Sequence, residues 1–337
     1  MDVTPGAATP ESGASHAGAR ARGAHWYRGD CHVHSVYSDG ELAPDRLAAD
    51  ARAVGLDFLA TTEHNTASAH GVWGPLASDG LLILLGEEVT TKTGHWLALG
   101  IPPGELIEWD YGVADDLIGR GLRQVRDSGG ISVAAHPHAP YPSGSFMYSY
   151  EGFDAVEVWN GLWASERPWN ADNEAALAAW GQALVQGIRT GRWRPAIGSS
   201  DTHLEGQIGI PHTVVLAEEL SAAAILDGLR AGRSWIAEAS TVDLSLSAVA
   251  AGHTAGIGER LSAHRESVRV RARVSGVPRA TVSFHTDLGE VHCESLSGSG
   301  TGTLVWHTRS EDSAFVRIEV RHPHGGMAAL TNPIVLT

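Results

Sequence analysis

From Arg28 to about Ala239, the chain alternates short apolar runs with longer amphipathic segments. Short runs rich in Val, Ile and Leu are typical of buried strands, and segments with apolar residues three or four apart are typical of helices. Strands that alternate with helices in this way predict an α/β fold with a βα-type sheet or barrel. The predicted strands are 29–35, 57–62, 81–88, 95–99, 131–135, 155–159, 196–199 and 213–216.

Residues that favour helix starts and ends bound several of the amphipathic segments. Pro44 suits a first helical turn, Ser221 suits an N-cap, and Gly55 and Gly232 suit helix ends. These signals place helices between several of the predicted strands, as the fold class requires. The predicted helices are 45–54, 115–128, 171–189 and 222–231.

The pattern changes after Ala239 to alternating apolar and polar residues at 268–274, 280–285 and 314–320. Such alternation is typical of antiparallel strands with one buried face, and about 100 residues suffice for a small sandwich. The first residues are rich in Ala, Gly, Ser and Pro and lack the apolar stretch of a secretion signal. The sequence therefore predicts a disordered leader at 1–24, a barrel at 25–239 and an all-β, sandwich-like domain at 240–337.

Composition narrows the functional classes. The 337 residues include 39 acidic and 24 basic side chains, a formal net charge of −15 that disfavours a nucleic-acid surface. The two cysteines, Cys31 and Cys293, are too few for a disulfide framework, which favours a reducing cytoplasm. No apolar run approaches the length that a membrane-spanning helix needs. We expect a cytoplasmic protein with a small-molecule substrate, and the sequence leaves its oligomeric state open.

Histidine pairs provide the first candidate chemistry. On an extended strand, His32 and His34 would point the same way and could hold one metal ion. With 18 His residues in the chain, however, about one His-x-His pair is expected by chance. His136 and His138 form a second pair and His322 and His324 a third, so the first pair alone is weak support.

Carboxylates and imidazoles also follow most of the other predicted strands. Side chains at the carboxyl ends of barrel strands converge on one mouth, so such residues can share a pocket although they lie far apart in sequence. A mixture of imidazole and carboxylate without Cys suits Zn, Mn or Fe. Each cluster taken singly could also have a purely structural role, such as a surface ion pair or a helix cap. The clusters are His32 with His34, Asp39, Glu63 with His64, Glu87 and Glu88 with His95, His136, and Asp201 with His203.

The order of these clusters is more specific than any one of them. The ordered runs are Gly29-Asp30-Cys31-His32-Val33-His34, Ser38-Asp39-Gly40, Thr62-Glu63-His64-Asn65, Gly86-Glu87-Glu88-Val89-Thr90, Gly94-His95, Ala135-His136-Pro137 and Ser199-Ser200-Asp201-Thr202-His203. Together they resemble the polymerase and histidinol phosphatase (PHP) superfamily of metallohydrolases over residues 25–238. The spacing of Glu88 and His95 and the run Val156-Glu157-Val158-Trp159-Asn160 resemble the CehA/McbA branch, which includes an aryl carbamate hydrolase.

The resemblance implies a distorted (β/α)7 PHP barrel with two or three divalent metal ions. It assigns His32, His34, Glu88 and Asp201 to one ion. Glu88 would bridge to a second ion held with His95 and His136, and the spacing favours Glu88 over Glu87 as the bridge. Asp39, His64 and His203 would hold a third ion. Many family members have Thr-Asp-His where this chain has Thr62-Glu63-His64, which leaves the role of position 63 open.

These ligands predict a metal-dependent hydrolase, of the PHP phosphoesterase type, that attacks a small phosphoester with a hydroxide bridging the metal ions. Asp201 is the candidate base, and His203 or His138 the candidate acid. His138, Asn160 and Arg233 are candidate substrate contacts, although His138 could equally be a loop residue and Arg233 could seal the barrel's end.

Two other functions stay open. One is carbamate or ester hydrolysis of the carbaryl-hydrolase type, for which Trp159, Trp163 and Trp169 could supply an apolar pocket. The other is a non-catalytic metal-binding module. Six histidines after residue 250 have no carboxylate partners in a recognisable order, and we expect them to be surface or structural residues; they are His253, His285, His292, His307, His322 and His324.

Overall fold

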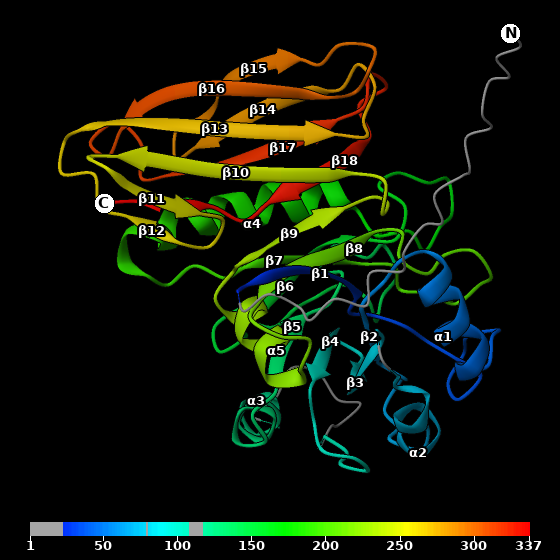
Figure 1. Cartoon of the computed structure of the whole chain (residues 1–337). Helices are drawn as coiled ribbons and strands as arrows, with labels where there is room; N and C mark the ends of the chain where they lie inside the picture. The colour runs from blue at the N-terminus through cyan, green and yellow to red at the C-terminus, as the bar shows by residue number, and fades with distance from the viewer. Residues whose placement is uncertain (1–22, 79, 108–116) are drawn as a thin grey trace, which may run out of the picture.

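The computed structural model describes residues 23–78, 80–107 and 117–337 (Figure 1). Residues 1–22 of the predicted leader lie outside the described residues, so its disorder stays a prediction. The first two residues of the helix predicted at 115–128 also lie outside them. Among the helices of the described ranges, none combines the length and the apolar character needed to cross a bilayer.

A curled sheet forms the first part of the molecule (Figure 1). Parallel pairing joins β1 to β2, β2 to β3, β5 to β6 and β6 to β7. Antiparallel pairing joins β3 to β4, β4 to β5, β1 to β8 and β8 to β9. The strands are β1 (His25–Asp30), β2 (Phe58–Thr61), β3 (Leu82–Thr91), β4 (Gly94–Leu99), β5 (Ile131–Ala134), β6 (Ala155–Asn160), β7 (Ala196–Ser199), β8 (His212–Ala217) and β9 (Ser234–Ala237).

The two sides of the curled sheet meet where β7 approaches β8 and β9. Gly198 N donates to Thr213 Oγ1 at 2.9 Å, and the Thr213 hydroxyl donates to Gly198 O at 2.7 Å. A Cβ atom at Gly198 would lie 2.3 Å from Ile236 Cγ2, so the close approach of β9 requires a glycine there. The Thr213 side chain on β8 thus makes hydrogen bonds to β7 where a closed barrel would have backbone hydrogen bonds between two strands.

Helices cover the curled sheet at the predicted positions with small shifts at their ends. The Asp172 side chain caps α4 by accepting from Ala175 N, and Ser221 caps α5 by accepting from Ala224 N. The short α2 was not predicted. The helices are α1 (Pro44–Ala53), α2 (His70–Trp73), α3 (Leu117–Asp127), α4 (Asn173–Gly187) and α5 (Ala222–Arg230), with 3₁₀ turns η1 (Gly74–Leu76) and η2 (Ile188–Thr190).

The second part contains two facing layers of strands with an apolar core between them. One layer has the order β11-β10-β13-β16, and the other contains β14, β15, β17, β18, β12 and β19. This second sheet agrees with the predicted all-β, sandwich-like part. The strands are β10 (Asp243–Ala250), β11 (His253–Gly256), β12 (Arg260–Leu261), β13 (Ser267–Ser275), β14 (Thr281–Thr286), β15 (Gly289–Ser295), β16 (Gly302–Arg309), β17 (Phe315–Arg321), β18 (Met327–Thr331) and β19 (Ile334–Leu336).

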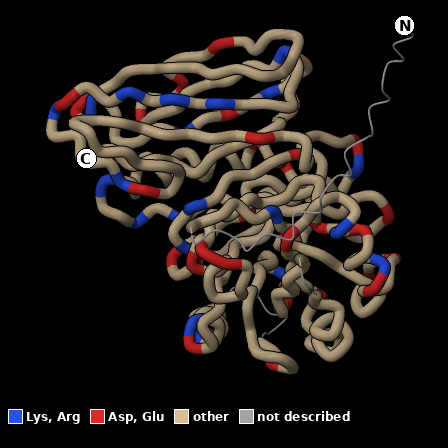
Figure 2. The backbone as a smooth tube through the Cα atoms, in the orientation of Figure 1, with Lys and Arg blue, Asp and Glu red and all other residues tan. Residues whose placement is uncertain are grey.

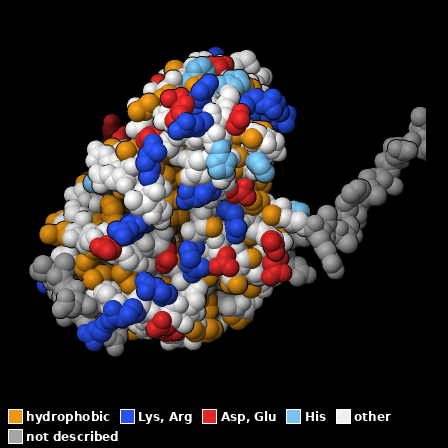
Figure 3. Space-filling model, turned by 90° about the vertical axis from the view of Figure 1, so that its left-hand side faces the viewer, with side chains coloured by type: hydrophobic (Ala, Val, Ile, Leu, Met, Phe, Trp, Pro, Cys, Tyr) orange, Lys and Arg blue, Asp and Glu red, His pale blue; other side chains and the backbone are white. Residues whose placement is uncertain are grey.

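Strand β13 shows how alternation in the sequence sorts side chains to its two faces. Val268, Val270, Ala272 and Val274 are buried in the core, and Arg269, Arg271 and Arg273 between them are exposed. Figure 2 shows these arginines as successive basic positions along the strand. On the face shown in Figure 3, by contrast, Lys and Arg side chains lie interspersed with acidic ones.

The two parts share one sheet across the predicted domain boundary. Strand β9 pairs with β8 on one side and with β18 on the other, so the curled sheet continues into the second part. Asn332 strengthens this junction, because its amide exchanges hydrogen bonds with Ala196 and donates to Ser234 O. Helix α4 lies beneath this part of the sheet (Figure 1). The division at residue 239 stays a prediction.

Candidate metal centre

The segment after β1 carries the first two candidate ligands. β1 ends at Asp30, so His32 and His34 follow the strand instead of lying on it as predicted. The segment stays extended because Val33 N donates to Thr62 Oγ1 and His34 N donates to Thr202 O. These bonds, from the segments after β2 and β7, hold the two imidazoles with their ring centres 5.0 Å apart.

Asp30, at the end of β1, fixes the start of this segment. Its buried carboxylate accepts from Ser200 N at 3.0 Å and from Gly209 N at 2.8 Å. Burial raises the pKa of Asp30 to about 6, although the hydrogen bonds from Ser200 and Gly209 oppose the rise. The anchor joins the end of β1 to the segment after β7, which carries Asp201.

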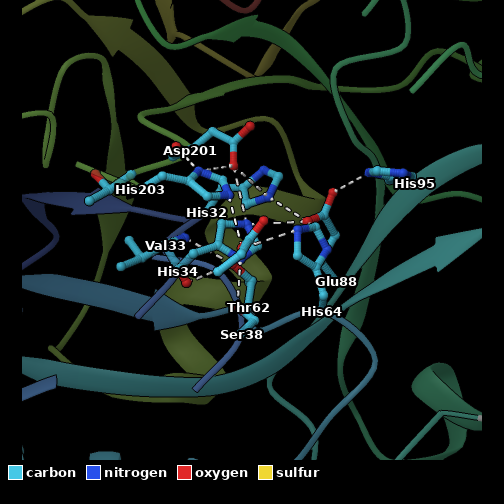
Figure 4. Close-up of polar contacts among 12 residues, drawn as sticks. His32, Val33, His34, Ser38, Thr62, His64, Glu88, His95, Asp201 and His203 are labelled. Carbon is cyan, nitrogen blue, oxygen red and sulfur yellow. Dashed lines mark hydrogen bonds and ion pairs between the residues drawn. The ribbon is translucent and has the colours of Figure 1, made fainter. Parts of the chain in front are cut away.

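Four side chains form the first donor group (Figure 4). The Nε2 atoms of His32 and His34 each lie 3.2 Å from Glu88 Oε2. Both Nε2 atoms also lie 3.2 Å from Asp201 Oδ1. The structure therefore brings together the two imidazoles and two carboxylates that the resemblance assigns to one ion.

The second donor group surrounds the other oxygen of Glu88. Glu88 Oε1 lies 3.0 Å from His95 Nδ1 and 3.0 Å from His136 Nε2. Glu88 thus contacts both groups, as a bridging carboxylate would. The neighbouring Glu87 lies on the other side of β3, where its Oε2 accepts from Ile107 N at 2.9 Å. The position of Glu88 agrees with the prediction that Glu88, and not Glu87, is the bridging carboxylate.

The third group lies nearer the solvent, around Asp39. Asp39 Oδ1 lies 3.1 Å from His203 Nε2, 3.5 Å from His64 Nε2 and 3.8 Å from His34 Nδ1. The ring of His34 stacks between those of His64 and His203, with ring centres 4.4 and 4.3 Å away. The predicted set of Asp39, His64 and His203 is therefore assembled, with His34 as an additional neighbour.

The backbone is unusual at two of these residues. His136 has a φ of 26° and Asp201 a φ of 50°, in a region that side-chain-bearing residues rarely occupy. Such conformations cost on the order of 1–3 kcal/mol and persist where the surrounding structure enforces them. Both residues follow strand ends, and the strained backbone turns their side chains toward Glu88.

Buried polar atoms without hydrogen-bonding partners test whether cations fit this cluster. His32 Nε2 lies 3.2 Å from Glu88 Oε2 and from Asp201 Oδ1, but it forms no hydrogen bond with either oxygen. Ligand atoms that surround one metal ion are arranged in this way. Leaving such atoms unpaired costs about 1–3 kcal/mol each, so the donor set fits divalent cations such as Zn, Mn or Fe. In the described part of the chain, the unpaired atoms of the first donor group are His32 Nε2, His34 Nε2, Glu88 Oε2 and Asp201 Oδ1.

The charges of the cluster agree with this fit. Burial raises the pKa of Glu88, but the imidazoles of His32 and His64 outweigh it and hold that pKa well below its usual range. Burial lowers the pKa of His64, but the carboxylates of Glu88 and Asp39 outweigh it and raise that pKa to about 11. Three converging carboxylates therefore need positive charge beside them, which cations supply directly.

Glu157 on β6 is a functional residue that sequence reasoning missed. Its buried carboxylate lies 3.1 Å from His32 Nδ1 and accepts from His136 N at 2.8 Å and from Asn160 Nδ2 at 3.0 Å. A carboxylate on Nδ1 fixes the imidazole tautomer that leaves Nε2 free for a metal. The available signal was a carboxylate inside the otherwise apolar run 155–159.

Glu63 has a different role, which answers the question left open by the sequence. Its buried carboxylate accepts from Ser35 N at 3.1 Å, from the hydroxyl groups of Ser35 and Ser38, and from Trp73 Nε1 at 3.3 Å. These contacts fix the loop after His34. Glu63 therefore positions Asp39, which that loop carries, and does not itself join the donor groups.

A cavity of about 610 Å³ opens above the donor groups. Tyr141 forms part of its wall, with its ring centre 6.0 Å from that of His95 and 6.1 Å from that of His136. A Cβ atom at Gly144 would lie 2.3 Å from the Tyr141 ring, so the glycine makes room for it. The loop after β6 adds Leu162, Arg167 and Trp169 to the lining.

The three predicted substrate contacts, Asn160, His138 and Arg233, lie in three different surroundings. Asn160 lines the cavity, but its Nδ2 donates to Glu157 and to Asp201 Oδ2, at 3.2 Å from the latter. His138 bridges to Ser145 in a turn beside the cavity, and Tyr141 occupies the lining position instead. Arg233 precedes β9 near Leu216, which pairs with Trp26 at the start of β1 and so at the end of the strand opposite the site. His138 and Arg233 are not among the residues that line this cavity, and their roles as substrate contacts stay predictions.

Comparisons with known proteins bear on the fold alone. No protein-family model and no curated protein matches this chain. A provisionally assigned metal-dependent phosphoesterase from Bifidobacterium adolescentis overlays with a TM-score of 0.38 at 20% identity, over 54% of this chain and 90% of that chain. An amidohydrolase from Chromobacterium violaceum, with bound sulfate and no metal, overlays with a TM-score of 0.36 at 19% identity, over 54% and 89%.

A third solved structure overlays much more completely. It is a two-domain protein from Bacteroides vulgatus that contains a predicted PHP-like metal-dependent phosphoesterase. The overlay has a TM-score of 0.53 at 16% identity and covers 94% of this chain and 100% of that chain. Of the three overlays, this one has a TM-score above 0.5. This chain therefore shares the overall fold of the Bacteroides protein, a mixed α/β part with a curled sheet joined to a second sheet.

Proposed function

We propose that the protein is a metal-dependent hydrolase that cleaves a small phosphoester, with two or three divalent ions of Mn, Zn or Fe at the donor groups. The observation that carries the proposal is the position of Glu88. One of its carboxylate oxygens faces His32 and His34, and the other faces His95 and His136. Carboxylates shared in this way hold two cations a few ångströms apart, which is the arrangement of two-metal hydrolytic sites.

The residues would hold the ions in three places. His32, His34, Glu88 and Asp201 would hold the first ion, Glu88 with His95 and His136 the second, and Asp39 with His64 and His203 the third. Such ions would lower the pKa of a coordinated water to about 7 and neutralise charge that develops on substrate oxygens.

The side chains around the ions would orient the reactants and carry the protons. Asn160 fixes the Asp201 carboxylate through Oδ2, and Asp201 would accept a proton from the attacking water. His203 lines the cavity and, with two ions bound and the third place empty, would be the acid toward the leaving group. Tyr141 also lines the cavity and would donate its phenolic proton in a hydrogen bond to a substrate oxygen.

The upper part of the cavity suggests the kind of phosphoester. Arg167 is the lining guanidinium that could pair with a phosphoryl oxygen. Leu162 is 50% exposed and Trp169 is 59% exposed, and both line the cavity, so an apolar leaving group would cover them. The same apolar wall favours a second candidate, an aryl carbamate or ester, because the same ions would stabilise an oxyanion at carbon.

Two finer assignments accompany this proposal. We propose that the curled sheet is a distorted (β/α)7 PHP barrel of the CehA/McbA-like branch, on the strength of the ordered motifs. We also retain the cytoplasm as the expected compartment, because the described residues include both cysteines, buried Cys31 and exposed Cys293, as free thiols.

The test is to strip the purified protein of metal and reload it separately with Mn, Zn and Fe. Phosphate release is then measured on a panel of phosphomonoesters, with aryl carbamate cleavage measured in parallel. We expect phosphate release that follows metal occupancy and is lost in His64→Ala while the fold persists. Carbamate cleavage alone would select the second candidate. Silence of a fully metallated protein on both panels would favour a non-catalytic metal-binding module.

A further inference from the structure

A second cavity lies between α4 and the face of β17 that points away from the sandwich core. Its volume is about 500 Å³, within the range of small-molecule sites, and it lies between the two parts of the fold, where such sites are common. One face of β17 packs Val316, Ile318 and Val320 into the sandwich core. The opposite face turns Phe315, Arg317, Glu319 and Arg321 toward this cavity. Both faces of β17 are therefore covered, and the face beneath α4 carries charged side chains.

Arg317 is the central group of this cavity. It is only 6% exposed, and its guanidinium carbon lies 5.2 Å from the ring centre of Trp180, which fixes its plane. The Trp180 ring is itself held by a 2.8 Å hydrogen bond from Nε1 to Arg194 O. Arg317 Nη1 donates to Glu319 Oε1 at 2.8 Å. The guanidinium is therefore held in one orientation before any ligand arrives.

The other edge of this guanidinium has no partner. Among the described residues, no acceptor hydrogen-bonds Arg317 Nε or Nη2, which form the planar donor pair that binds a carboxylate with two parallel bonds. His285, beside it on β14, forms no hydrogen bond through Nε2, but that atom lies 3.4 Å from Glu319 Oε1. Arg321 differs from Arg317, because Glu319 and Glu174 together occupy its donors. Arg317 is therefore the buried cation that presents a donor pair to the cavity.

Gly181 on α4 leaves space in front of this donor pair. A Cβ atom built at Gly181 would lie 4.0 Å from Arg317 Nη2, with no other heavy atom so near. Leu177, Val185 and Phe315 supply an apolar wall beside it. A glycine inside a helix costs about 1 kcal/mol relative to alanine, and here its absent side chain keeps the cavity open.

We propose that this cavity is a second binding site, which takes a small monocarboxylate with an apolar body. The carboxylate would accept two bonds from Arg317 Nε and Nη2, and the apolar body would cover Leu177 and Phe315. Glu319 next to Arg317 disfavours a second negative charge, so a monoanion fits better than a phosphate dianion. The site lies away from the metal-centre cavity, and the two cavities share no lining residue.

The test is calorimetric titration of the full-length protein with benzoate, and with benzamide as the uncharged match. We expect saturable benzoate binding, and binding of benzamide that is weaker by at least about tenfold. Gly181→Leu should weaken benzoate binding by at least about tenfold, because its side chain fills the space before the donor pair, and should keep or raise the Tm. Arg317→Gln should weaken binding similarly.

Two control variants show whether the loss of binding is specific to this cavity. Gly119→Leu makes the same change within α3 and should leave benzoate affinity unchanged. Asp201→Asn should also leave it unchanged, because Asp201 lies in the other cavity. The proposal is overturned if benzoate shows no saturable binding, or if Gly181→Leu and Arg317→Gln bind it as tightly as the unmodified protein.

Discussion

Glu157→Gln offers the sharpest test of how the metal centre is organised. The substitution keeps the shape of a buried side chain but replaces one of its two acceptor oxygens by an amide nitrogen. In the protein as it stands, one oxygen faces His32 Nδ1 and the other accepts from His136 N and Asn160 Nδ2. A glutamine can satisfy one of these two sides at a time.

Either orientation of the glutamine has a definite cost. If its amide nitrogen faces His32 Nδ1, the imidazole must carry its proton on Nε2, which then points at the metal position and blocks it. If the nitrogen faces the other side, His136 N loses its acceptor, at a cost of about 1–3 kcal/mol. Loss of an orienting partner of this kind typically weakens metal affinity by about 10–100-fold, or roughly 1.4–2.8 kcal/mol.

The measurement is a chelator competition titration of Zn and Mn on Glu157→Gln, together with bound metal per chain and the Tm. The matched control is Glu219→Gln, a carboxylate on the exposed surface, which should bind metal as the unmodified protein does. We expect weaker binding in Glu157→Gln with the fold retained. Metal affinity equal to that of the control would refute the view that Glu157 sets the tautomer of His32.

Three further predictions follow from other residues. Tyr141→Phe should lower kcat on a phosphomonoester by about 100–1,000-fold with unchanged metal content, because it removes one hydrogen-bond donor from the cavity; unchanged kcat would contradict this role. Glu63→Gln should lower the affinity for the third metal ion and lower the Tm, because the loop that carries Asp39 loses part of its anchor. Metal titration and thermal unfolding measure the two effects. A variant with unchanged metal affinity and unchanged Tm would contradict this role of Glu63. Burial lowers the pKa of His212 from 6.5 to about 4, so in the unfolded chain His212 binds a proton at a higher pH than in the folded protein. Its contribution to stability is therefore present above pH 6.5 and lost as the pH falls from about 6.5 to 4, by about 3 kcal/mol. His212→Gln should remove that part of the acid dependence in denaturant titrations across this range, and an identical pH profile for the variant would contradict it.

Much of the metal centre followed from the order of residues along the chain. Side chains near the carboxyl ends of barrel strands converge on one mouth, and the order of the motifs, through the resemblance it carries, grouped His32, Glu88 and Asp201 before the structure did. The motif spacing favoured Glu88 over Glu87, and the structure adds the physical reason, because adjacent residues on a strand face opposite sides. The change from helical to alternating periodicity after Ala239 likewise anticipated the second sheet.

Other features depended on contacts between segments that no local pattern relates. Glu157 looks in the sequence like an odd residue in an apolar strand, and only its neighbours His32 and His136 give it a role. Chain direction likewise places Arg233 at the end of β1 opposite the candidate metal centre, and the turn after β5 brings Tyr141 into the lining of the cavity.

The sequence by itself determined which residues are apolar, which carry donor atoms, and on which face of a strand each lies, since these depend on periods of two or about four residues. The tertiary structure decided which buried faces meet. It joined β9 to β18 across the predicted domain boundary and set Arg317 beneath Gly181 of α4. Periodicity specifies that a face is covered, but packing between distant segments specifies what covers it.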